Sequence, residues 1–143
     1  MNWLFDLSFH LRLAGLTLIF LGFAHAFFGP RFKWREETAR LSLLNRQIFY
    51  VHTFYLAFVL VLMGILCVFG TRGLVEITFL GRWLCAGMTL FWASRLGFQF
   101  FVYSPELWRG KRLETFMHAL FTCAWTYYSA VFGWAWWLQM QAA

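Results

Sequence analysis

Residues 48–69 read IFYVHTFYLAFVLVLMGILCVF, an apolar stretch that contains no Asp, Glu, Lys or Arg. A helix needs about 20 apolar residues to cross the roughly 30 Å hydrocarbon core of a bilayer, and this stretch is long enough. The rest of the chain agrees, because its 143 residues are 62% hydrophobic and only 13% charged, which is far from the composition of a soluble domain. The sequence therefore predicts an integral membrane protein.

Three further segments have the same apolar character, and the connections between the four segments are short. The predicted spans are residues 11–28, 48–69, 83–103 and 116–138. Helices joined by short loops run antiparallel to their neighbours in a bundle. The sequence thus predicts an all-α fold, a four-helix up-down membrane bundle that forms a single domain over residues 1–143.

The connections on one side of the bundle carry helix signals of their own. In residues 31–45, the pairs Lys33/Glu37 and Glu36/Arg40 have i,i+4 spacing, which predicts an interfacial amphipathic helix. We expect Gly29-Pro30 to stop the first span and Asn45 to cap the second. Ser104-Pro105-Glu106 predicts the start of another short helix, which would end at Gly110.

Loop charge predicts the orientation of the bundle. Lys and Arg are concentrated in the first and third connections, at Arg31, Lys33, Arg35, Arg40, Arg46, Arg109, Lys111 and Arg112. The positive-inside rule places these connections in the cytoplasm. Both termini are then non-cytoplasmic, in what we expect to be a bacterial-type inner membrane.

Aromatic residues agree with these boundaries. Trp34, Tyr50, Tyr103 and Trp108 would mark the cytoplasmic edge, and Trp3, Trp83, Trp134, Trp136 and Trp137 the opposite one. The formal net charge of +6 is explained by contact with anionic lipids. No nucleic-acid partner is expected.

Three of the four histidines lie about one helical turn inside the cytoplasmic ends of the predicted spans, namely His25, His52 and His118. Ionisable residues inside a membrane are costly, and they often mark functional sites. On the first span, His25 shares one helix face with Gly15, Leu18 and Gly22, and small residues of this kind allow helices to pack closely. The histidines are therefore predicted to face other helices in one cytoplasmic-side layer.

Two residues of the third span extend this layer. Gln99 lies near the depth of the histidines, and Arg95 lies deeper, at about 12 Å from the boundary. No acidic residue lies inside any predicted span. Arg95 must therefore contact backbone carbonyls, hydroxyls, aromatic faces, water or an anionic ligand.

The layer predicts a binding site made of His25, His52, His118, Arg95 and Gln99. Two histidines on facing helices can hold a haem iron from both sides, which makes haem b one candidate ligand. A quinone-like ligand is another, with Arg95 beside its carbonyl. Either ligand would place the protein in electron transfer.

A metal ion is the third candidate ligand, bound by His25, His52 and His118 together with Glu114. For each histidine the competing interpretation is structural, since membrane histidines often form hydrogen bonds between helices.

Two other functions fit the same sequence. The chain could be a cofactor-free accessory or scaffold subunit that packs against a larger membrane complex, or a metal-dependent lipid-modifying enzyme whose basic loops hold an anionic headgroup. Phosphate-binding Gly-rich loops, Gly-x-Ser-x-Gly elbows and His-Glu-x-x-His motifs do not occur. Whether the protein is an enzyme is left open by its sequence.

Overall fold

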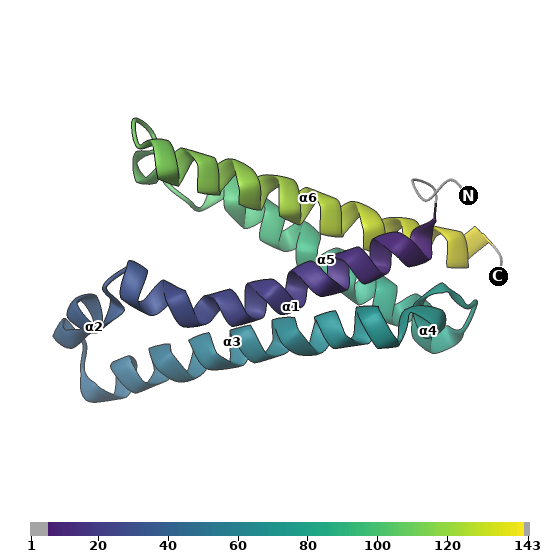
Figure 1. Cartoon of the computed structure of the whole chain (residues 1–143), viewed down its shortest axis with the longest axis horizontal. Helices are drawn as coiled ribbons and strands as arrows, with labels where there is room; N and C mark the ends of the chain where they lie inside the picture. Colours follow the sequence, from purple (N-terminus) through teal and green to yellow (C-terminus); the bar gives the residue numbers. More distant parts are fainter. Residues whose placement is uncertain (1–5, 142–143) are drawn as a thin grey trace. The chain divides into compact units, whose positions relative to one another are not determined.

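The computed structural model describes residues 6–141, and in this range all regular secondary structure is helical, without strands (Figure 1). The elements are α1 (Leu7–Arg31), α2 (Trp34–Glu37), the 3-10 helix η2 (Thr38–Arg40), α3 (Leu43–Phe69), α4 (Thr71–Val75), α5 (Phe79–Phe101), the 3-10 helix η3 (Pro105–Leu107) and α6 (Arg112–Gln141). The all-α prediction is thus confirmed. The predicted belt residue Trp3 lies outside the described residues.

The four predicted spans fall on the long helices α1, α3, α5 and α6, with end points shifted by a few residues. Two of the described helices, α1 and α3, are long and apolar enough to cross a membrane. α5 contains Arg82 and Arg95, and α6 carries His, Trp and Tyr side chains along its length. The arrangement with four spans therefore stays a prediction.

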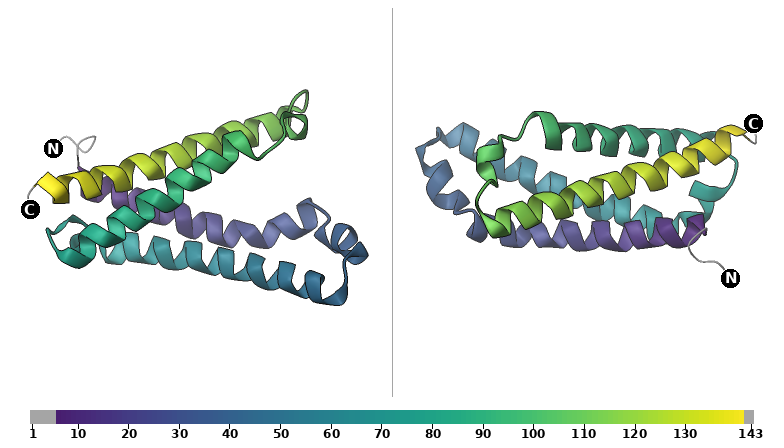
Figure 2. Two further views of the ribbon diagram at one scale, coloured as in Figure 1. Left: turned by 180° about the vertical axis from the view of Figure 1, so that it is seen from behind. Right: turned by 90° about the horizontal axis from the view of Figure 1, so that it is seen from above.

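Internal contacts divide the chain into two compact units. Among the described residues, the α1/α3 unit comprises 11–71, and the α5/α6 unit comprises 6–10 and 72–141. The first turn of α1 thus belongs to the α5/α6 unit. Each unit is built on one pair of long helices that lie side by side (Figures 1 and 2).

α1 and α3 pack through glycines that bring their backbones together. A Cβ atom added to Gly15 would lie 2.7 Å from the carbonyl oxygen of Gly64, and one added to Gly64 would lie 2.6 Å from the carbonyl oxygen of Gly15. At Gly22, an added Cβ would lie 2.6 Å from Cγ2 of Val61 and 2.9 Å from the carbonyl oxygen of Ala57. These positions have no room for a side chain. The close-packing face predicted for the first span is therefore confirmed.

α5 and α6 pack through large aromatic side chains. The rings of Trp92 and Trp125 stack with centroids 5.1 Å apart and planes 17° apart, and the Tyr128 ring lies 4.7 Å from that of Trp92. Nearer the other end of the pair, Gln139 is fully buried and its Nε2 donates to the carbonyl oxygen of Leu74 at 2.8 Å. Ring stacking and a buried amide thus hold the α5/α6 unit together, whereas contact between backbones holds the α1/α3 unit together.

The first connection differs from the amphipathic helix predicted for residues 31–45. Lys33 has φ 51° and ψ 38°, in the left-handed region, so α2 begins only at Trp34 and has four residues. Thr38 Oγ1 donates to the Trp34 carbonyl at 2.6 Å, and the chain continues as η2. The helical i,i+4 register is therefore broken, and neither Lys33/Glu37 nor Glu36/Arg40 forms an ion pair within residues 6–141.

Two predicted helix ends also need correction. α1 runs one residue past Pro30, to Arg31, since a proline in the last turn removes only one hydrogen bond. α3 is capped by Ser42, whose Oγ accepts a hydrogen bond from the Asn45 backbone N–H at 3.4 Å, and Asn45 itself is not the cap.

The third connection starts its short helix as predicted, but that helix is the 3-10 helix η3, which ends at Leu107 before Gly110 is reached. Ser104 Oγ accepts a hydrogen bond from the Glu106 backbone N–H at 3.4 Å, and Pro105 occupies the first position of η3. Gly110 has φ 78°, a left-handed conformation that glycine adopts without strain. This connection brings Trp108 to the start of α6.

Candidate functional site

Three residues of the predicted site are linked by hydrogen bonds in the α5/α6 unit. Gln99 Nε2 lies 2.8 Å from Nδ1 of His118, and Nη1 of Arg95 donates to Oε1 of Gln99 at 3.4 Å. Arg95 and Gln99 lie one turn apart on α5, and His118 lies near the start of α6. Gln99 is buried, while Arg95 and His118 are half-buried. We call this group, with the aromatic residues around it, the Arg95–His118 cluster.

The donors around Gln99 determine which way its amide points. Oε1 faces the Arg95 guanidinium and also Nε1 of Trp125, at 3.4 Å from each. Both of these groups can only donate hydrogen bonds, so the atom that they share must be the oxygen. The amide nitrogen then faces His118.

The orientation of the Gln99 amide also determines which ring nitrogen of His118 carries the proton. The amide nitrogen of Gln99 can only donate, so Nδ1 of His118 must accept and cannot carry hydrogen. In the neutral imidazole the proton is therefore on Nε2. His118 presents a hydrogen-bond donor at Nε2, whereas a metal or haem ligand needs a lone pair there.

Arg95 is surrounded by the kinds of group that its sequence position predicted. Nη2 lies 3.5 Å from the hydroxyl of Tyr103, and Cζ lies 5.5 Å from the Tyr103 ring centroid and 5.0 Å from that of Trp125. In the described part of the chain, no carboxylate forms an ion pair with Arg95. Cation–π contacts and neutral acceptors thus replace a counter-ion.

One face of the His118 ring is covered by Trp108, with centroids 3.8 Å apart and planes 11° apart. The Trp108 backbone carbonyl accepts a hydrogen bond from Thr115 Oγ1 at 2.7 Å, which ties the connection to α6. The sequence indicated Tyr103 and Trp108 only as boundary residues. Their role as walls of this cluster depends on how the connection folds back, which no local pattern encodes.

His25 and His52 lie in the α1/α3 unit and have the opposite hydrogen-bond arrangement. Nδ1 of His25 donates to the Leu21 carbonyl at 2.8 Å, and Nδ1 of His52 donates to the Ile48 carbonyl, also at 2.8 Å. A carbonyl can only accept, so the proton is on Nδ1 and Nε2 keeps its lone pair. These two histidines have the protonation form that a haem or metal ligand needs.

Within the α1/α3 unit, His25 lines a cavity of about 300 Å³ and His52 does not. Besides His25, the lining residues are Gly22, Phe23, Ala26, Tyr50, Thr53, Phe54 and Ala57. His52 is exposed on α3. The shared site predicted for the two histidines therefore gains no support from this cavity.

The predicted metal ligands are divided between the two units. Glu114 and His118 are one turn apart on α6, and His25 and His52 belong to the α1/α3 unit. No three His, Cys, Asp or Glu side chains gather as a metal site among the residues that the structure describes. The four-residue set stays a prediction.

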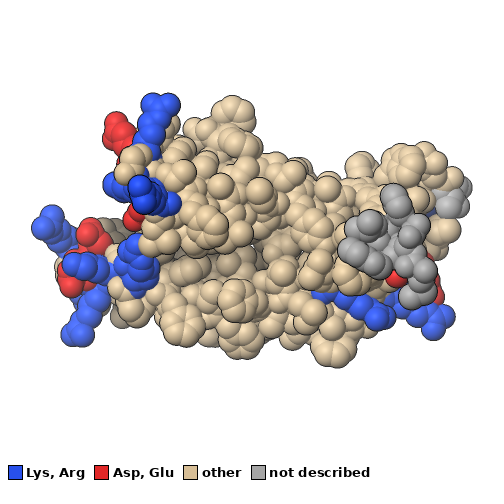
Figure 3. All heavy atoms as spheres, turned by 45° about the horizontal axis from the view of Figure 1, so that its top comes forward, with Lys and Arg blue, Asp and Glu red and all other residues tan. Residues whose placement is uncertain are grey.

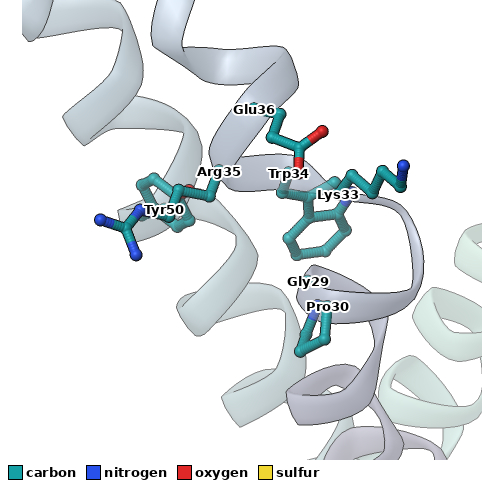
Figure 4. Close-up of a pocket in the computed structure, with 7 residues that line it drawn as sticks. All are labelled: Gly29, Pro30, Lys33, Trp34, Arg35, Glu36 and Tyr50. Carbon is teal, nitrogen blue, oxygen red and sulfur yellow. The ribbon is translucent and has the colours of Figure 1, made fainter.

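A second cavity in the α1/α3 unit was not predicted. It has a volume of about 410 Å³ and lies where the first connection meets α3, beside Trp34 and Tyr50 (Figure 4). The only sequence signal for it was the combination of basic and aromatic residues in that connection.

Comparisons of the chain with protein-family models, with curated protein sequences and with solved structures give no match.

Proposed function

We propose that this chain is a four-span integral membrane protein whose Arg95–His118 cluster binds the carbonyl oxygen of a quinone-like ligand. The observation that carries the proposal is the order of hydrogen bonds around Gln99, which leaves His118 Nε2–H as a donor in the same cluster as the Arg95 guanidinium. Both groups offer hydrogen to an oxygen atom. Neither offers a lone pair to a metal.

Exposure of apolar side chains supports the membrane part of the proposal. In the most apolar windows of α1 and α3, only 28% and 17% of the residues are buried. The core helix of a soluble protein would be buried over most of such a window. On the face shown in Figure 3, Lys, Arg, Asp and Glu side chains gather in a few groups, and most of the visible surface is uncharged. Lipid is the solvent that suits such a surface.

The lengths of α5 and α6 support four spans. They have 23 and 30 residues, and a span takes about 20. Their lower hydropathy comes partly from polar residues that are paired inside the unit, such as Gln99 and Gln139. Phe79 and Phe101, at the two ends of α5, are 80% and 89% exposed, which suits lipid contact.

The chemistry of the cluster favours a flat molecule that bears a carbonyl. Arg95, His118 and Tyr103 can each donate a hydrogen bond, and Trp108 offers an aromatic surface beside them. A quinone ring carries carbonyl oxygens that accept such bonds, and its plane can stack on an aromatic side chain. Haem b or a metal ion at His118 would require breaking the Gln99 contact. These ligands are better suited to a histidine that keeps its Nε2 lone pair, as His25 does.

Reporter fusions test the topology. Because the basic residues lie in the first and third connections, a reporter inserted at Thr38 should be cytoplasmic and one fused after Ala143 should be non-cytoplasmic. Reporters on opposite sides from these, or an odd number of spans, would contradict the proposal.

Binding of a short-chain benzoquinone to the purified protein in detergent tests the ligand, with quenching of tryptophan fluorescence as the readout. Arg95→Leu and His118→Phe should each weaken binding by about tenfold or more, the effect of losing a hydrogen bond from a charged or positioned donor. Arg109→Leu, on the exposed third connection, is the matched control and should change binding less than about twofold.

Two outcomes would overturn the quinone proposal. One is equal affinity in all three variants. The other is the absence of quinone binding by folded protein, and if haem and stoichiometric metal were also absent, the cofactor-free scaffold would become the better account.

A further inference from the structure

The unpredicted cavity beside Trp34 combines aromatic walls with a charged rim. Its lining consists of Gly29, Pro30, Lys33, Trp34, Arg35, Glu36 and Tyr50. The Trp34 ring lies next to the turn at Gly29 and Pro30. Lys33 and Arg35 extend to opposite sides of this ring (Figure 4). An added Cβ on Gly29 would lie 3.5 Å from Cε3 of Trp34, so the indole contacts this turn.

Thr38 fixes the two aromatic walls relative to each other. Its hydroxyl donates to the Trp34 carbonyl at 2.6 Å and lies 3.3 Å from the Tyr50 hydroxyl. The Trp34 ring also meets the Phe49 ring edge-on, with centroids 5.1 Å apart. Thr38 is 5% exposed. The walls of the cavity are therefore held in place by contacts within the α1/α3 unit.

The rim of the cavity carries more positive than negative charge. Lys33 and Arg35 are exposed, and neither forms an ion pair with a described residue. Glu36 is the only acidic lining residue. Trp and Tyr walls with Lys and Arg at the rim are the chemistry of a headgroup site at the edge of a membrane.

Tyr50 also lines the cavity that contains His25, so the two cavities are neighbours. The cavity that contains His25 is apolar apart from His25, Tyr50 and Thr53, and its lining includes the small residues Gly22, Ala26 and Ala57. These small residues leave a groove at the helix surface. The charged cavity at the helix end and the apolar groove share Tyr50 as a lining residue, and together they match the polarity of a phospholipid headgroup and acyl chain.

We infer that the two cavities together bind one anionic phospholipid. Its phosphate would lie at the rim between Lys33 and Arg35, against Trp34 and Tyr50, and one acyl chain would lie in the groove beside His25. Charge complementarity at the rim, and the shared position of Tyr50 in both cavities, select this occupant. A haem held by His25 would fill the same groove, so the two ligands exclude each other.

Native mass spectrometry of the protein in detergent, titrated with phosphatidylglycerol, tests the inference. Lys33→Asn combined with Arg35→Gln removes both rim charges, and asparagine tolerates the left-handed backbone at position 33. This double variant should bind the lipid about tenfold more weakly. The matched control, Arg109→Gln with Lys111→Gln, removes two exposed charges elsewhere and should change the affinity less than about twofold.

A second variant and two other ligands separate the sources of affinity. Ala26→Trp fills the groove from an exposed position, and it should also weaken phosphatidylglycerol binding about tenfold, since it displaces the acyl chain. Phosphatidylcholine should bind more weakly than phosphatidylglycerol, and inorganic phosphate should not compete.

The inference is overturned if the rim variant and its control lose equal affinity, because net charge alone would then explain binding. It is also overturned if Ala26→Trp has no effect, if inorganic phosphate displaces the lipid, or if haem occupies the groove. Circular dichroism confirms that each variant is folded before its affinity is compared. None of these outcomes bears on quinone binding at the Arg95–His118 cluster.

Discussion

The two units use the same residue type, histidine, with opposite proton placement. In the α1/α3 unit, His25 and His52 donate through Nδ1 to carbonyls of their own helices. In the α5/α6 unit, His118 accepts through Nδ1 from the amide of Gln99 on a neighbouring helix. The first arrangement leaves a lone pair at Nε2, and the second leaves a hydrogen. The partner of Nδ1 thus decides whether a membrane histidine can ligate a metal or donate to an oxygen.

The two units also differ in how their helices pack. The α1/α3 unit is held by contact between backbones at Gly15 and Gly64, which needs little from side chains. The α5/α6 unit is held by the stacked rings of Trp92 and Trp125, and Trp125 also donates to Gln99. Helix packing and the Arg95–His118 cluster are therefore coupled in the α5/α6 unit, because Trp125 takes part in both.

The largest expected effect is the loss of a core ring in the α5/α6 unit. Trp92 is 1% exposed, so Trp92→Ala should lower the free energy of unfolding by about 3–5 kcal/mol through lost contacts and a cavity. Thermal unfolding in detergent measures this. Leu90→Ala, at a 72% exposed site on the same helix, is the control. Equal effects at the two sites would mean that ring stacking does not hold this unit together.

A smaller effect is expected from one methyl group between α1 and α3. In Gly64→Ala, the added Cβ would lie 2.6 Å from the carbonyl oxygen of Gly15. This overlap should destabilise the protein by about 1–3 kcal/mol. Gly87→Ala is the matched control in α5, since an added Cβ there meets nothing within 4 Å. It should be neutral or stabilising by up to about 1 kcal/mol. Similar stability of both variants would contradict the backbone packing.

The smallest expected change in stability concerns Arg95. Arg95→Leu removes a costly charge from a predicted span, so the fold should be retained or slightly stabilised. The same variant should weaken quinone binding, and Arg95→Lys should restore little of it, because a single ammonium cannot replace a planar guanidinium that contacts two rings. Unfolding of Arg95→Leu, with unchanged binding per folded molecule, would make Arg95 a structural residue.

Helix positions could be predicted from the sequence because they depend on local apolar length. The close-packing face of α1 was also predictable, since Gly15 and Gly22 recur on one helix face. The break at Lys33 was not, because residues 31–45 carry helical spacing and only the tertiary contacts of Trp34 and Thr38 override it.

The Arg95–His118 cluster was predictable in part. Counting residues from the span ends placed Gln99 near the depth of His118, and the two side chains are hydrogen-bonded in the structure. Depth gave no information on which atom donates. That property depends on Trp125 and Arg95 converging on one oxygen, which involves side chains from two helices and their rotamers.

Nitrogen-15 NMR of the histidine side chains tests the central claim, the opposite proton placement in the two units. In the neutral rings, His118 should carry its proton on Nε2, and His25 and His52 should carry theirs on Nδ1. In Gln99→Glu the new carboxylate can only accept, so Nδ1 of His118 should then carry a proton. A wild-type His118 protonated on Nδ1, or one unaffected by Gln99→Glu, would contradict the account.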